Sequence, residues 1–589
     1  MSAARESAGT NNGPLGWKAL FPPARWLPTY ERSWLRADVV AGITLAAYAI
    51  PVSLAYAGLA GLPPQVGIYG YLLGGLGYAL FGSSRHLAVG PTSAISLMVG
   101  GTIGQMAGGD AVLYGQIATL SGFVLAAMSL VAWLLRLSTL TSFISETILL
   151  GFKAGAGLTI ASTQLAAFFG VPGGGDHFFV RVVTVATQLR NLDPVTTTVG
   201  VVALALLLIG DRHLPGRPVA LMVVALSILA VSLTPLGQKG LSLVGSVPSG
   251  LPTLGLPALR PREVDGVIPL AFGCLLLAYI EGVSAARTFA VKHGYPLDAR
   301  QELLGLGVAN LLVASGGGYP VAGGLSQSAV NEKAGAKTPL ALVFASATLA
   351  LCLVFLTGLV ESLPKAVLAA IVLVAVKGLI NIREMVRLRQ VSRFEFWVAM
   401  VAFAAVLLEG VLRGVLFAAV VSILMLLRRA ANPHVAFLGR IPGTRRFSDL
   451  ERHPDNERTA GVLAFRIESS LLYFNAENVM HAVLEQLRDE GASVRLVVCD
   501  LSSSPYVDLA GAHMLDSLSD ELAKRNVMLR VTDARASVRD LLRAQAVDEK
   551  VGGINRFASV ADVVDDFLAG SAGANRRGAT SHSPTSVET

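Results

Sequence analysis

VVAGITLAAYAIPVSLAYAGLAGLPPQVGIYGYLLGGLGYALFGSS, residues 39–84, contains no Asp, Glu, Lys, Arg or His. A helix that crosses a bilayer needs about 20 apolar residues, so this run is long enough for two crossings. Two further runs without a charged residue or histidine follow at 87–109 and 111–135. The sequence therefore predicts a polytopic α-helical membrane protein.

The composition supports this prediction. The chain has 589 residues, of which 53% are hydrophobic and 15% charged, whereas soluble domains carry about 25% charged residues. The net charge of +7 is typical of basic loops beside a membrane, so we expect a lipid bilayer and no nucleic acid as partner. The three cysteines, Cys274, Cys352 and Cys499, have no metal or redox spacing, and we expect no metal and no cofactor.

Basic clusters predict the orientation. Apolar segments recur from Asp38 to Leu427, which leaves room for about twelve to fourteen spans or half-spans. Clusters of arginine and lysine lie before the first span, between two late spans and after the last: Lys18, Arg25, Arg32 and Arg36; Arg383, Arg387, Arg389 and Arg393; Arg428 and Arg429. Basic loops stay in the cytoplasm. We therefore expect a cytoplasmic N-terminal segment, 1–37, and a transmembrane domain, 38–430, in the cell's inner (plasma) membrane.

The character of the chain changes after Arg429. Residues 431–459 are polar and suit a linker, and residues 571–589 are predicted to be a disordered tail. Between them, 460–570 alternates strand-like and helix-like patterns, which predicts a small cytoplasmic α/β domain. The expected strands are 462–467, 471–474, 494–501 and 527–531, and the expected helices 478–490, 511–525 and 537–545.

Two apolar segments are too short to span a bilayer. One lies near 92–104 and the other near 324–331, and each follows a Gly/Pro-rich stretch, 86–91 or 316–324. Paired interrupted segments of this kind are typical of transporters built from inverted repeats. A half-helix that begins inside the membrane points its free N–H groups and positive dipole end inward, so two facing ends predict an anion site.

Glu281 is the one charged residue between Phe272 and Ser284. Intramembrane carboxylates are costly and usually functional, so we predict that Glu281 binds the coupling proton; Arg287 or Lys292 could lie near it. The other charged residues of the apolar region are predicted to lie at span ends in structural roles: Glu146, Lys153, Glu361, Lys365, Lys377, Glu409 and Arg413.

These segments also carry motifs of a known family. FGSSRHLAVGP at 81–91, GYPV at 318–321 and SQSAVN at 326–331 resemble the SulP (sulfate permease) anion transporters, and YFNAE at 473–477 is similar to their C-terminal STAS domain. The resemblance implies fourteen membrane segments in two inverted repeats of seven, divided into a core domain and a gate domain. It also implies an elevator movement of the core and a homodimer.

The resemblance assigns the anion-binding positions to Val52, Tyr56, Thr92, Ser93, Ala94, Ser326, Gln327 and Ser328. Two positions depart from the family: Val52 stands where members usually have Gln, and Gln327 where they usually have Arg. Glu281 matches the acidic residue of proton-coupled members. In the STAS-like part, Asp508-Leu509-Ala510-Gly511 has no hydroxyl at the position of the bacterial phosphorylation switch, so we expect no such switch.

The predicted function is secondary active transport of small inorganic anions of the sulfate type, coupled to protons, with sodium left open. Bicarbonate, chloride and dicarboxylate remain possible substrates. Loss of the family's Gln and Arg also leaves open an uncoupled, channel-like anion conductor, and a third hypothesis is a regulatory scaffold acting through the STAS-like domain. No nucleophile–base pair, phosphate loop or metal spacing indicates an enzyme.

Overall fold

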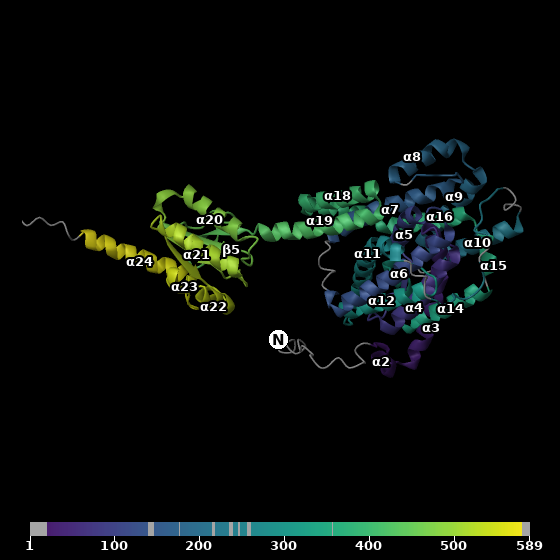
Figure 1. The fold of residues 1–589 in the computed structure, drawn as a ribbon, viewed down its shortest axis with the longest axis horizontal. Helices are drawn as coiled ribbons and strands as arrows, with labels where there is room; N and C mark the ends of the chain where they lie inside the picture. Colours follow the sequence, from purple (N-terminus) through teal and green to yellow (C-terminus); the bar gives the residue numbers. More distant parts are fainter. Residues whose placement is uncertain are drawn as a thin grey trace, which may run out of the picture. The chain divides into compact units, whose positions relative to one another are not determined.

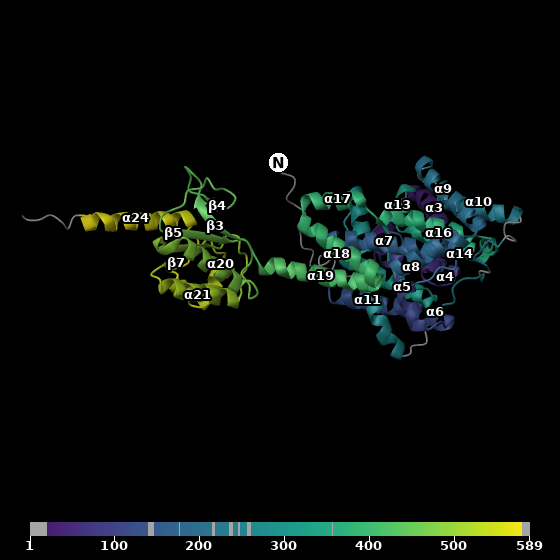
Figure 2. The ribbon, with the colours of Figure 1, turned by 90° about the horizontal axis from the view of Figure 1, so that it is seen from above.

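The computed structural model describes residues 21–138, 146–175, 177–214, 218–234, 240–245, 248–255, 261–355 and 357–579. The chain divides into two compact units, Met1–Ser422 and Ile423–Thr589. The first is a bundle of helices, and the second combines a β-sheet with helices (Figures 1 and 2). Residues 1–20 of the predicted N-terminal segment and residues 580–589 of the predicted disordered tail lie outside the described residues.

The helical unit begins with two short turns, α2 (Pro23–Trp26) and η1 (Leu27–Thr29). The helices that follow, up to the first long loop, are α3 (Arg32–Leu59), α4 (Pro64–Phe81), α5 (Ser93–Ala107), α6 (Ala111–Leu134), α7 (Glu146–Phe169), α8 (Phe178–Gln188), α9 (Pro194–His213) and α10 (Val219–Leu233). The later helices are α11 (Pro261–His293), α12 (Ala299–Ser315), α13 (Leu325–Lys333), α14 (Leu340–Phe355), α15 (Thr357–Val360), α16 (Lys365–Val376), α17 (Ile382–Val391), α18 (Arg393–Glu409) and α19 (Val411–Ala431).

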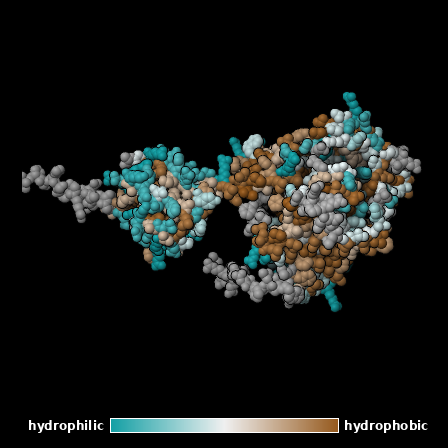
Figure 3. All heavy atoms as spheres, in the orientation of Figure 1, coloured by the Kyte–Doolittle hydropathy of each residue, from teal (hydrophilic) through white to brown (hydrophobic). Residues whose placement is uncertain are grey.

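Seven of the described helices are long and apolar enough to cross a membrane by length and composition. Their outer faces are apolar too: Leu208, Ile209, Leu226 and Leu229 are among the exposed large side chains. Hydrophobic residues cover much of the visible surface of the helical unit, while the α/β unit is mostly hydrophilic (Figure 3). Soluble domains rarely expose so large an apolar surface to water. The prediction of a membrane-embedded unit is therefore confirmed.

Two short strands cross at the centre of the helical unit. β1 (Val89–Gly90) pairs antiparallel with β2 (Ala322–Gly323), with Val89 opposite Gly323. The crossing needs small residues, because a Cβ on Gly90 would lie 2.3 Å from the Tyr71 ring and one on Gly323 would lie 2.7 Å from Leu87. Each strand leads directly into a half-helix, so the antiparallel pair relates the two halves in the manner that inverted repeats require.

The α/β unit contains a five-stranded sheet of order β4-β3-β5-β6-β7. Its strands are β3 (Val435–Arg440), β4 (Phe447–Asp449), β5 (Val462–Ile467), β6 (Leu496–Asp500) and β7 (Met528–Thr532). β5, β6 and β7 are parallel, and β3 pairs antiparallel with β4 and β5. The helices are α20 (Ala476–Asp489), α21 (Leu509–Ala523), α22 (Ala536–Ala544), α23 (Val547–Lys550) and α24 (Val560–Ala579).

The structure corrects three boundaries. Residues 431–459 are not a plain linker, because β3 and β4 lie within them and extend the sheet beyond β5. The predicted strand 471–474 is wrong: only Leu471 makes a bridge, to Val507, and side chains fix the following turn, where Asp508 accepts from the Tyr473 N–H at 2.8 Å. The predicted tail from 571 is helical as far as Ala579, where α24 ends.

Candidate functional site: two half-helix ends at one cavity

The first half-helix, α5, begins at Ser93 behind the turn Pro91–Thr92. Thr92 is the N-cap residue, but its side chain makes no capping hydrogen bond. Its Oγ1 is buried and has no hydrogen-bond partner among the described residues. A buried hydroxyl without a partner is costly. Thr92 therefore presents an unused hydrogen-bonding group beside the free N–H groups of the helix end.

The second half-helix, α13, begins at Leu325 after Gly324, which occupies the N-cap position. The first backbone bond of α13 runs from the Ser328 N–H to the Gly324 carbonyl at 3.1 Å. The N–H groups of Leu325, Ser326 and Gln327 therefore have no partner within the helix. Each half-helix thus begins with free N–H donors, at the positive end of its helix dipole.

Both ends open on one cavity of about 170 Å³. Among its lining residues are Tyr56 from α3 and the three residues at the start of α5, namely Thr92, Ser93 and Ala94. Ser326 and Gln327 from α13 line it as well. The structure thus brings together residues that are more than 200 positions apart in the sequence.

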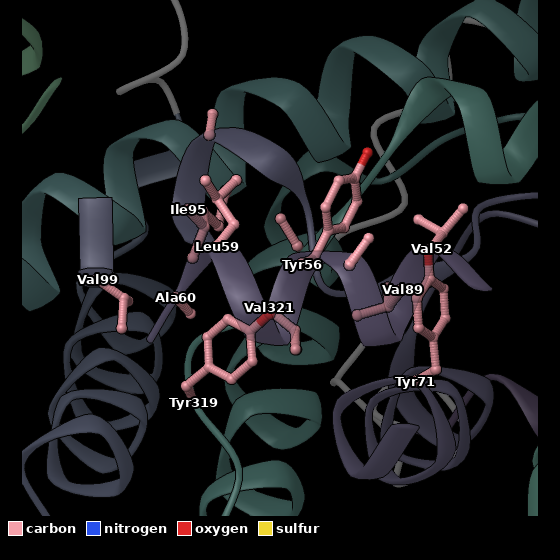
Figure 4. Close-up of a cluster of buried hydrophobic side chains, with 14 of the residues drawn as sticks. Val52, Tyr56, Leu59, Ala60, Tyr71, Val89, Ile95, Val99, Tyr319 and Val321 are labelled. Carbon is pink, nitrogen blue, oxygen red and sulfur yellow. The ribbon is translucent and has the colours of Figure 1, made fainter. Parts of the chain in front are cut away.

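Two predicted site residues do not line this cavity. Val52 is only 4% exposed and belongs to a buried apolar cluster that includes Tyr71 and Val89 (Figure 4). The Ser328 hydroxyl accepts a hydrogen bond from the Ala88 N–H at 2.9 Å and donates one to the Gly324 carbonyl at 2.7 Å. In this structure, both side chains hold the scaffold around the cavity.

The side chain of Gln327 also forms hydrogen bonds with the backbone around the two strands. Its Nε2 donates to the Ala88 carbonyl at 2.8 Å and to the Ala322 carbonyl at 3.2 Å, and its Oε1 accepts from the Tyr71 hydroxyl. Both amide hydrogens are therefore engaged with backbone on the two sides of the strand crossing. Gln327, at the position where the family usually has Arg, therefore links the β1 and β2 segments. It also lines the cavity.

The cavity also contains one lysine and one glutamate: Lys153 from α7 and Glu281 from α11. No ion pair joins these two described residues, although both line the same small space. Lys292, suggested above as a neighbour of Glu281, instead pairs with Glu332 at 2.8 Å. Arg287, the other suggested neighbour, does not line the cavity, so among the described lining residues the cation is Lys153.

Lys153 is the main residue that the sequence reasoning missed, because it was assigned to a span end. A signal was present: between Thr147 and Gly175 it is the only charged residue. Tyr48 and Tyr71 also line the cavity and were not predicted. Behind it, Asn310 fixes the approach to β2, with its side-chain amide bonded to both the N–H and the carbonyl of Val321 at 2.9 and 3.1 Å.

Comparison with known proteins agrees with this architecture. Residues 35–402 match the Sulfate permease family, and residues 453–563 match the STAS domain. The chain belongs to the sulfate permease family. Its members are transport proteins and not enzymes, as predicted. The matched STAS range begins after β3 and β4, so the sheet of this permease extends beyond that range on its N-terminal side.

Relatives share most of the chain. A probable sulfate transporter of Mycobacterium tuberculosis is 34% identical over 92% of this chain and 98% of its own length. Probable sulfate transporter 3.4 of Arabidopsis thaliana is 30% identical over 96% and 90%. Among solved structures, the murine Solute Carrier 26 family member A9 anion transporter has a TM-score of 0.86 at 22% identity, covering 97% of both chains. This permease therefore has their fold, a multi-pass helical domain followed by a STAS domain.

The STAS turn lacks a phosphorylatable residue in the structure as in the sequence. Asp508 caps α21, because its carboxylate accepts from the Gly511 N–H at 2.8 Å. Leu509, which lies in the turn where bacterial relatives carry the phosphorylated Ser, is exposed. The aspartate at this turn therefore serves as a helix cap.

Proposed function

We propose that this permease is a secondary active transporter of small inorganic anions, of the sulfate type, coupled to protons through Glu281. The observation that carries the proposal is the meeting of two half-helix ends, the unpartnered Thr92 hydroxyl, Lys153 and Glu281 at one cavity. The names of the relatives, both sulfate transporters, favour sulfate as the anion.

A charge argument links the anion to the proton. Each helix end acts as about +0.5 charge, so the two ends and Lys153 together offer about +2 when Glu281 is protonated. An ionised Glu281 lowers this sum to about +1. A divalent anion is therefore best matched after Glu281 takes up a proton, and release of the proton weakens anion binding. Proton and sulfate would then travel together, as symport requires.

The charge at the cavity also distinguishes the other candidate anions and coupling ions. A monovalent anion such as chloride or bicarbonate matches the cavity with Glu281 ionised, so its transport would not need a proton. A dicarboxylate carries the charge of sulfate in a longer molecule. An uncoupled conductor would show no dependence on protons for any anion. Sodium in place of the proton would neutralise Glu281 in the same manner.

The remaining parts of the proposal concern movement and assembly. α11 packs on both half-helices, α5 and α13, whereas the main neighbours of α7 are α16 and α18, with a smaller contact to α5. This packing supports an elevator in which α11 and the half-helices move as one body along the α5–α7 contact. We place the N-terminus and the STAS domain in the cytoplasm, since the basic clusters flank the spans. We also propose a plasma-membrane homodimer, which rests on the family resemblance.

Uptake into proteoliposomes tests the proposal. The purified protein is reconstituted, and labelled sulfate, bicarbonate, chloride and fumarate are offered with and without an inward proton gradient. We expect sulfate uptake that the gradient accelerates. Uptake of a monovalent anion without gradient dependence, or large salt-gradient currents without a counter-ion, would contradict proton-coupled sulfate transport. A chain truncated after Asn432 tests the STAS domain: continued transport makes the domain accessory.

A further inference from the structure

A second cavity adjoins the anion cavity. It has a volume of about 210 Å³, and its lining includes Thr44, Tyr48, Asp211 and Lys333. Tyr48 lines both cavities, so a single side chain lies at the boundary between them. The first cavity is called the inner cavity below, and the second the outer cavity.

The order of residues along two helices places the outer cavity. On α3, Thr44 and Tyr48 line the outer cavity, and Tyr56, two turns further on, lines the inner one. On α13, Ser326 and Gln327 line the inner cavity, and Lys333 near the end of the helix lines the outer one. The outer cavity therefore lies toward the start of α3, the side that the proposed orientation assigns to the cytoplasm.

Two opposite charges face this space from different helices. Lys333 belongs to α13, and Asp211 lies near the end of α9. Both residues are exposed. In the described part of the chain, neither side chain makes an ion pair or a hydrogen bond, so both charges act on whatever occupies the cavity. Lys333 shares its helix with Ser326, which is two turns closer to the inner cavity.

We infer that the outer cavity is a second anion-holding subsite on the cytoplasmic route to the inner cavity, with Lys333 as the residue that captures the anion and Asp211 as the residue that shortens its stay. Tyr48 separates the two subsites. The inference rests on the proposed function. An anion in the outer cavity is attracted by Lys333 and repelled by Asp211, and the positive N-terminal end of α13, at the inner cavity, attracts it further inward.

The opposite charges of Lys333 and Asp211 also keep the affinity of the subsite low enough for the anion to leave. An intermediate subsite speeds passage only if the anion leaves it readily, because binding must be favourable enough for entry and weak enough for exit. Lys333 alone would hold a divalent anion at the entrance. Asp211 lowers that affinity while the anion is still far from the inner cavity, and the effect is largest for an anion of two charges.

Kinetics at the two faces of the membrane test the inference. In oriented proteoliposomes, Lys333→Gln is expected to raise the KM for sulfate offered from the cytoplasmic face roughly two- to five-fold, the size of an exposed charge interaction. The KM from the opposite face and kcat stay unchanged. Asp211→Asn lowers the cytoplasmic KM. Both effects shrink between 0.05 M and 0.5 M salt, because ions screen exposed charges.

Lys337→Gln is the matched control, because Lys337 is an exposed lysine four residues further along that does not line the outer cavity. Lys333→Arg keeps the charge and should restore the KM, which separates a folding defect from loss of capture. Equal KM values for Lys333→Gln and Lys337→Gln, in a wild-type protein that transports sulfate, overturn this inference alone. Absence of any anion transport by the wild-type protein overturns the proposed function and this inference together.

Discussion

Lys153 of α7 and Glu281 of α11 line the same cavity of about 170 Å³, between the beginnings of α5 and α13. The lysine adds to the positive field of the two helix ends, and the glutamate opposes it when ionised. The cavity therefore holds a fixed cation, two fixed dipoles and one carboxylate.

Glu281→Gln is expected to uncouple anion uptake from the proton gradient. The amide resembles the protonated carboxyl but cannot release a proton, so the cavity stays in its anion-binding form at every pH. Sulfate uptake by proteoliposomes is measured with and without an inward proton gradient. The control is Glu361→Gln, which changes an exposed glutamate that does not line the cavity. Coupling that survives in Glu281→Gln would assign the proton to another group.

Lys153→Gln is expected to weaken anion binding. A hydrogen bond between charged groups contributes about 1.5–3 kcal/mol, which corresponds to a rise in KM of roughly ten-fold to a hundred-fold. The measurement is the KM for sulfate uptake. Lys365→Gln serves as control, since Lys365 is exposed at the start of α16 and does not line the cavity. An unchanged KM in Lys153→Gln would limit the anion's contacts to the helix ends.

Thr92→Val is expected to raise the KM for the anion by roughly ten-fold, through loss of one hydrogen bond to a charged group. Valine keeps the shape of threonine, and the Thr92 hydroxyl has no partner in the described protein, so thermal stability should not fall. Thr92→Ser keeps the hydroxyl and should keep the KM. Should both variants transport alike, the hydroxyl would have no contact with the anion.

Gln327→Ala is expected to destabilise the protein more than it alters the anion contacts. The variant removes the side-chain partner of the Ala322 carbonyl and of the Tyr71 hydroxyl, while the Ala88 carbonyl keeps the Gly324 N–H at 3.3 Å. The cost is about 1–3 kcal/mol for each buried group that stays unpaired. The melting temperature in detergent should drop by several degrees. Ser326→Ala, at the neighbouring position exposed to the cavity, should leave it unchanged. Equal melting temperatures for the two variants would contradict the role of Gln327 at the strand crossing.

In the STAS domain, the start of α24 is expected to loosen in acid. Asp562 accepts hydrogen bonds from the Ser559 hydroxyl at 2.6 Å, the Ser559 N–H at 2.9 Å and Arg445 at 2.8 Å. These bonds lower the pKa of Asp562 from its usual 3.8 to about 2. A carboxylate with a lowered pKa stabilises the fold above its unfolded pKa, and that stabilisation is lost as the pH falls from about 4 to about 2.

Hydrogen exchange of the first turn of α24 measures this loosening, after correction for the intrinsic pH dependence of exchange. Asp562→Asn should remove the extra acceleration in acid. Asp566→Asn should keep it, because Asp566 is exposed and the ion pairs of Arg445 are to Asp562 and Asp565. Acceleration of the same size in all three proteins would place the acid-sensitive group elsewhere.

Local patterns predicted most of the fold. The expected helix at 478–490 is α20 at Ala476–Asp489, and the expected strand at 527–531 is β7 at Met528–Thr532. These elements have strong periodicity and polar boundaries. β3 was missed because its short apolar run, Val435–Leu438, stands among the polar residues of 431–459, and its pairing with β5 is a contact between separate parts of the chain that the sequence does not show. At 471–474, capping side chains overrode the strand preference of aromatic and aliphatic residues.

The site was predictable where a pattern marks it and not where packing alone creates it. The Gly/Pro stretches before residues 92 and 324 indicate broken helices. Thr92 and Ser326 could therefore be predicted from the sequence as residues at the half-helix ends. The isolation of Lys153 in an uncharged stretch could have marked it as functional, but its place at this cavity depends on how α7 lies against the half-helices. The engagement of Gln327 with the backbone depends likewise on the crossing of β1 and β2.

The positive charge at the cavity is on a different helix from the two dipole ends. In a permease with an arginine at position 327, charge and dipole would travel together, and the anion would feel the same attraction wherever the half-helices went. Here Lys153 belongs to α7, while the dipoles belong to α5 and α13. Under the proposed elevator, a displacement of the half-helices from α7 would draw the anion away from Lys153. Anion affinity would then depend on the position of the half-helices, so that the movement itself would weaken anion binding.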